Sequence, residues 1–220
     1  MRRAQRLIVS LALMVSACSG SQSSPRDAGT IAPITALSET ERGWFASSLP
    51  SATKKREVAI PGDLLTDDDR TQENLTVLSL HNDAEQVVGY AREVFTPVGC
   101  TAGACQAIRF VLVFTTSFAF LDIFHPPGTS HDLMKYFEGT YSHFSADDWQ
   151  RLKEILANPP AVLLAVTDYH DLVIGASATA PTRVEYQSAV VRGAAFTVYQ
   201  VLKYLLATRT ILQRLFGSGS

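Results

Sequence analysis

Several motifs that mark common functional sites are absent from this 220-residue sequence. Only three cysteines occur, at positions 18, 100 and 105, and none lies in a CxxCH segment, which excludes covalent haem attachment of that type. The five histidines form no HxH or HxxxH pair backed by carboxylates, so surface or loop positions are favoured over a metal site. No GxSxG segment is present, which argues against a serine hydrolase.

Positive charge is also sparse. The formal net charge is −2, and residues 1–17 hold Arg2, Arg3 and Arg6 without any acidic residue, which leaves 16 basic and 21 acidic residues after them. The sequence offers no basic patch to neutralise phosphates, so a nucleic-acid partner is not expected. Hydrophobic residues make up 46% of the chain, which is typical of a packed globular domain.

The N-terminus lacks an apolar run long enough to span a membrane, and its pattern is typical of a signal peptide. Three arginines precede the apolar residues 7–15, and the segment Val15-Ser16-Ala17-Cys18 resembles a bacterial lipobox. We therefore expect residues 1–17 to be a lipoprotein signal peptide and Cys18 to carry lipid. An ordinary secretory signal followed by a chance cysteine is the alternative. Ser19, rather than Asp, favours the outer membrane of a Gram-negative host and a periplasm-facing protein.

The remaining cysteines, Cys100 and Cys105, would then lie in an oxidising compartment. Their four-residue spacer contains Gly103 and can close a small disulfide loop, which we favour over a pair of metal ligands. Residues 18–36 are rich in Ser, Gly and Pro and have no apolar period, so they predict a flexible tether. We place the folded domain at residues 37–220.

The folded domain is predicted to be α+β. Ser38 with Glu41 forms a capping-box pattern for a short helix through about Ser47. Strand patterns cover residues 75–80, 86–95, 108–114, 118–124 and 162–166. The third and fourth are rich in aromatic and β-branched residues, and predict an antiparallel hairpin at the centre of a sheet. The acidic run at residues 67–69 is expected to be a solvated surface.

Three further helices are expected, at residues 131–137, 145–157 and 184–216. Asn158-Pro159-Pro160 should end the second of them. In the third, seven apolar or small residues share one face: Val190, Ala194, Thr197, Val198, Val201, Leu205 and Leu212. The sum is an antiparallel-rich sheet with flanking helices and a long C-terminal helix, in a single domain.

A segment of small residues ahead of the last helix carries the most specific motif. Residues 171–177 read DLVIGAS, and small side chains let the backbone approach a ligand closely. The following helix N-terminus would offer N–H groups to a phosphate. The segment resembles the D-x-x-S/T-G-A-S/T motif of extracytoplasmic FMN-binding domains of the NosR/NqrC type. In that family a flavin transferase can attach the FMN phosphate to the last Ser or Thr.

Carried over, the resemblance implies that Ser177 is the attachment point and that Asp171 is the acid which the transferase requires. Gly175 and Ala176 would lie beside the phosphate, and Thr179 would supply the hydroxyl in a different loop register. Non-covalent FMN binding remains the open alternative to attachment at Ser177.

The family also has a Pro-Gly turn, usually ETPG, that follows a strand and lies against the flavin. Here residues 118–124 lead into His125-Pro126-Pro127-Gly128, in which Pro127 and Gly128 match. Phe124, Pro126, Pro127 and Tyr169 are the candidates to line the flavin slot, and core packing is the simpler role for Phe124.

The resemblance, which covers roughly residues 85–205, implies a lipid-anchored electron carrier that exchanges electrons with extracytoplasmic redox proteins such as cytochromes. Such a carrier would have no small-molecule substrate of its own. The alternative is a flavin-free periplasmic interaction or assembly lipoprotein on the same fold. Ile174, where the family has Ser or Thr, and the altered ETPG turn both favour this alternative.

Overall fold

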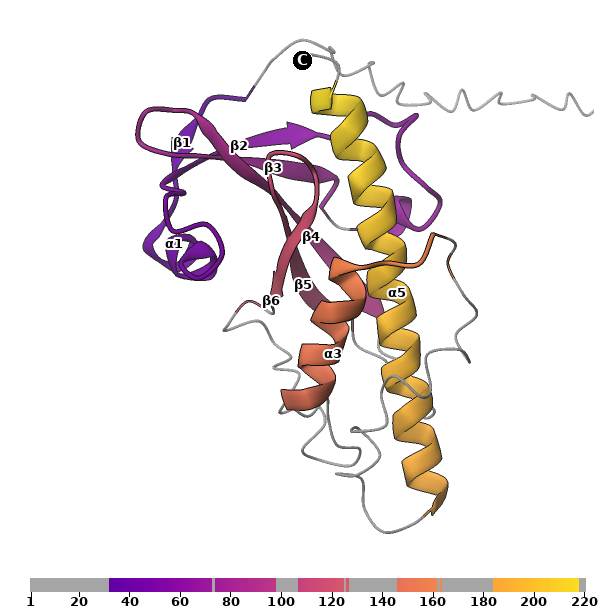
Figure 1. Ribbon diagram of the computed structural model, residues 1–220. Helices are drawn as coiled ribbons and strands as arrows, with labels where there is room; N and C mark the ends of the chain where they lie inside the picture. Colours follow the sequence, from indigo (N-terminus) through magenta and orange to yellow (C-terminus); the bar gives the residue numbers. More distant parts are fainter. Residues whose placement is uncertain are drawn as a thin grey trace, which may run out of the picture. The chain divides into compact units, whose positions relative to one another are not determined.

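Six antiparallel strands form one sheet in which every strand pairs with its neighbours in the chain (Figure 1). The computed structural model describes residues 32–72, 74–97, 107–124, 126, 146–161, 163 and 184–217. In order, the strands are β1 (Thr35–Ala36), β2 (Lys54–Ala59), β3 (Thr76–His81), β4 (Val87–Pro97), β5 (Ala107–Phe114) and β6 (Phe120–Phe124). The helices are α1 (Glu39–Phe45), a 3-10 turn η1 (Asp69–Thr71), α3 (Ala146–Ala157) and α5 (Val184–Phe216). The predicted α+β class is confirmed.

Two hairpins of the sheet use the same loop. Between β3 and β4 the Asn82 amide donates to the Gln86 carbonyl, and between β5 and β6 Thr115 donates to Ala119 in the same way. The fourth residue of each loop has a positive φ, 61° at Glu85 and 64° at Phe118. The pairing register shifts next to each loop, as expected for a type I turn followed by a bulge. Neither position is a glycine, so both hairpins hold a side chain in the left-handed region.

The sheet corrects three predictions from the sequence. The hairpin of β5 and β6 is antiparallel as predicted, but β6 is the last strand in the described sheet order and not a central one. Strand β2 (KKREVA) was not predicted, because four of its six residues are charged and no apolar alternation marks it. Strand β1 pairs with β2 two residues before the predicted end of the tether, so Thr35 and Ala36 belong to the fold.

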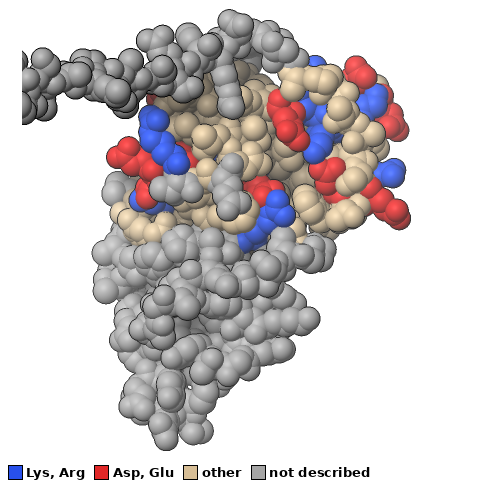
Figure 2. All heavy atoms as spheres, turned by 180° about the vertical axis from the view of Figure 1, so that it is seen from behind, with Lys and Arg blue, Asp and Glu red and all other residues tan. Residues whose placement is uncertain are grey.

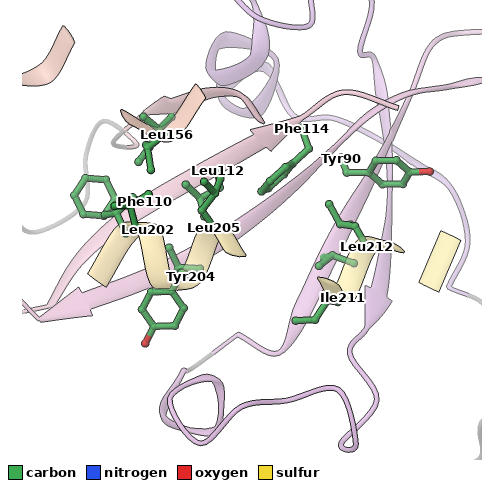
Figure 3. Close-up of a cluster of buried hydrophobic side chains, with 14 of the residues drawn as sticks. Tyr90, Phe110, Leu112, Phe114, Leu156, Leu202, Tyr204, Leu205, Ile211 and Leu212 are labelled. Atoms are coloured by element: carbon green, nitrogen blue, oxygen red, sulfur yellow. The ribbon is translucent and has the colours of Figure 1, made fainter. Parts of the chain in front are cut away.

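Helix α5 covers one face of the sheet and builds the larger core (Figure 3). Phe110, Leu112 and Phe114 alternate along β5 and point to this face, where they are fully buried. Helix α5 supplies the opposing side chains, and α3 packs against β6 and α5. The helix runs over the residues predicted for it, and its predicted face is buried at Val198, Val201, Leu205 and Leu212. Burial of each such side chain stabilises the fold by about 1.5–3 kcal/mol.

Helix α1 covers part of the opposite face. Its capping box is formed as predicted: the Glu41 amide donates to the Ser38 hydroxyl, and the Ser38 amide donates to the Glu41 carboxylate. The helix ends at Phe45, which is buried, and not at Ser47. Leu80, Ala91, Val111 and Val113 meet this helix from the sheet and form a second, smaller core.

The predicted helix at residues 145–157 is present as α3, and it ends directly before Asn158-Pro159-Pro160. Leu152 and Leu156 are buried on its inner side. The predicted helix over residues 131–137 lies outside the described residues, and of the predicted strand over residues 162–166 only Leu163 is described. All described residues belong to one compact unit, Ala32–Ser220.

Candidate functional site

The residues predicted to bind FMN, to carry lipid or to form a disulfide lie outside the described part of the chain. They are Asp171, Gly175, Ala176, Ser177, Thr179, Pro127, Gly128, Tyr169, Cys18, Cys100 and Cys105. The described elements bracket them in sequence, because β6 ends three residues before Pro127 and α5 begins seven residues after Ser177. Their roles therefore stay predictions.

Two candidates for the flavin slot, Phe124 and Pro126, are described. The Phe124 ring lies against both aromatic residues of α1, with its centroid 5.8 Å from that of Phe45 in an edge-on contact and 6.2 Å from that of Trp44. Pro126 is buried. The end of β6 therefore lies in an aromatic and apolar environment that β6 and α1 form together.

Two polar side-chain atoms near this surface are buried without a hydrogen-bond partner among the described residues. They are Trp44 Nε1 and Ser48 Oγ, at the end of α1 and in the turn that follows it. An unpaired buried donor is unfavourable by about 1–3 kcal/mol, so such atoms are rare in folded proteins. The sequence does not indicate that these two atoms are buried and unpaired, because Trp and Ser occur in many environments.

A buried ion pair joins the sheet, the 3-10 turn and α5. Arg92 Nη2 donates to Asp69 Oδ1 at 2.6 Å, and both side chains are fully buried. Arg92 Nη1 also donates to the Thr208 hydroxyl at 3.2 Å, which in turn donates to the Tyr204 carbonyl. Arg92 Nε has no hydrogen-bond partner among the described residues. The pair therefore joins β4 to the 3-10 turn and to α5, and it leaves Nε without a partner among the described residues.

The environment of Asp69 corrects the prediction that residues 67–69 form a solvated surface. Burial alone would raise the pKa of the Asp69 carboxyl, but the charge of Arg92 and the hydrogen bonds from the Thr66 hydroxyl and amide outweigh it, so this pKa lies below its ordinary value. Asp68, the preceding residue, remains partly exposed and pairs with Lys203 of α5. The sequence does contain one indication of the buried site: Tyr90, Arg92 and Val94 alternate onto the same face of β4.

A second polar contact fixes the same turn. The Gln72 side chain accepts from the Phe95 amide at 2.6 Å and donates to the Phe95 carbonyl at 3.0 Å, as an added strand would. Its amide nitrogen also donates to the Tyr204 hydroxyl at 2.6 Å. Residues 66–72 are therefore held to β4 and to α5 by side chains.

A half-open hollow of about 280 Å³ lies between this turn and α5. Its wall is mostly apolar and consists of Thr66, Asp68, Leu163, Lys203, Tyr204, Leu206, Ala207 and Thr210. The hydrogen bond to Asp68 raises the pKa of Lys203 at its edge. These lining residues include no histidine or cysteine.

Ser79 and His81 of β3 form a contact that could suggest a catalytic pair. The Ser79 hydroxyl lies 3.1 Å from His81 Nε2, and His81 Nδ1 lies 3.0 Å from the Glu85 carbonyl oxygen. Both side chains are at most 4% exposed, so no substrate can reach them. The contact of His81 with the Glu85 carbonyl ties the hairpin loop to β3.

Positive and negative charges alternate on the described surface. Figure 2 shows Lys and Arg next to Asp and Glu on the described part of its face, without a large area of one sign. Lys55, for example, bonds Glu41 at 2.7 Å and Glu57 at 3.1 Å. Within the described ranges no three His, Cys, Asp or Glu side chains are grouped to hold a metal ion. None of the described helices has the length and apolar character needed to cross a bilayer.

No protein-family model, curated protein or solved structure matches this chain. The relation to FMN-binding domains therefore stays a prediction from the residues of the motif and of the Pro-Gly turn.

Proposed function

We propose that this protein is a lipid-anchored, periplasm-facing FMN-binding protein that exchanges electrons with extracytoplasmic redox proteins such as cytochromes. The observation that carries the proposal is the segment DLVIGAS at residues 171–177, seven residues ahead of the long helix α5. A strand, a Pro-Gly turn and this motif follow one another along the chain in the order typical of the family.

The described residues next to the turn suit a flavin. An isoalloxazine ring needs a largely apolar slot with a few polar contacts. The end of β6 is apolar, because Phe124 packs on the α1 aromatics and Pro126 is buried. When bound, FMN would accept and release electrons, and the protein would bind and orient it.

The motif residues would hold the phosphate. The hydroxyl of Ser177 would form a phosphoester, which keeps the flavin from diffusing away in an open compartment. Gly175 and Ala176 leave room for the phosphate to approach backbone N–H groups. Asp171 would serve the transferase that makes the bond.

The test uses the full chain, expressed with a periplasmic flavin transferase and analysed by intact mass after denaturation. We expect a mass increase of one FMN less one water, which Ser177→Ala abolishes. Loss of the increase in Thr179→Ala instead would place the attachment at Thr179. An unmodified mass would refute covalent attachment. If the purified protein also shows no saturable FMN binding, the whole proposal is refuted.

A second candidate function is favoured by Ile174, which replaces the family's Ser or Thr in the motif. On this hypothesis the protein is a flavin-free interaction or assembly lipoprotein. Ile174→Thr separates the two hypotheses: if the protein is a flavin carrier, restoring the hydroxyl should raise the fraction that carries covalent FMN. A flavin-free protein would stay unmodified in both forms and would bind no added FMN.

A further inference from the structure

We draw no further inference here: the strongest candidate, the half-open hollow of about 280 Å³ between residues 66–68 and α5, is lined by apolar groups and by the ion pair of Lys203 with Asp68, and nothing in the structure shows what covers it.

Discussion

The buried pair of Arg92 and Asp69 gives the sharpest prediction about stability. In the variant Asp69→Asn the carboxylate charge is lost, but the guanidinium of Arg92 stays fully buried. The asparagine oxygen can still accept one hydrogen bond, but the buried guanidinium of Arg92 then has no compensating charge. Breaking a buried pair from one side typically costs about 3–5 kcal/mol.

This cost is large compared with the total stability of a domain, which is about 5–15 kcal/mol. We expect urea denaturation at neutral pH to show a loss of about 3–5 kcal/mol in the free energy of unfolding for Asp69→Asn. The control is Glu85→Gln, which removes the exposed partner of Lys54 and should cost less than about 1 kcal/mol. A loss below about 1 kcal/mol for Asp69→Asn would refute the reasoning.

The pH dependence of the same pair follows from the lowered pKa of Asp69. A carboxyl whose pKa is lower in the folded state stabilises the protein fully above its unfolded-state pKa, here near 3.8. The difference in stability between the wild type and Asp69→Asn should therefore be constant near neutral pH. It should shrink as the pH falls below about 4, through the folded-state pKa. A difference that grows on acidification would contradict this assignment.

Four further substitutions provide predictions, each measured as a change in the free energy of unfolding. Gly89→Ala should destabilise the fold by about 1–3 kcal/mol, because a Cβ there would lie 2.7 Å from the Phe114 carbonyl oxygen. In Gly43→Ala the new Cβ, on α1, meets no atom within 4 Å, so this variant should stabilise the fold by about 0.5–1 kcal/mol. Glu85→Gly should stabilise by about 1 kcal/mol, since φ is 61° there, and a loss of stability would show that the side chain matters more than the backbone strain. Ser38→Ala should cost about 1 kcal/mol by removing the helix cap, and an unchanged stability would mean that the capping box contributes nothing.

Local signals in the sequence were enough to predict most of the regular structure. The capping box at Ser38 and Glu41 predicted the start of α1, and the helical period after Val184 predicted α5 over its full length. Both signals act between residues a few positions apart. Strand β2 has no such signal, because Lys54–Ala59 is mostly charged and becomes a strand only through its pairing with β3.

The buried polar groups could not be predicted in the same way. The alternation along β4 places Arg92 on the inner face but does not reveal its partners, which lie 23 residues away at Asp69 and 116 residues away at Thr208. The position of β6 at the edge of the sheet likewise depends on the order of all strands. The aromatic pattern of Phe120–Phe124 does not indicate that order. The buried indole N–H of Trp44 could not be predicted either, because only the structure shows that it lacks a partner among the described residues.

The order of the strands has a consequence for how the chain reaches its folded state. Every strand pairs with the one before it in the chain, and the loops from β3 to β4 and from β5 to β6 are short, so these pairings cost little chain entropy. The side-chain bonds that attach α5 join residues 116 and 132 positions apart, which makes them the slowest contacts to close. Synthesis from the N-terminus delivers all six strands first, and Phe110, Leu112 and Phe114 then have no cover until α5 has been made. The nascent chain should therefore be most prone to aggregation after β6 has been synthesised and before α5 has been synthesised as far as Leu212.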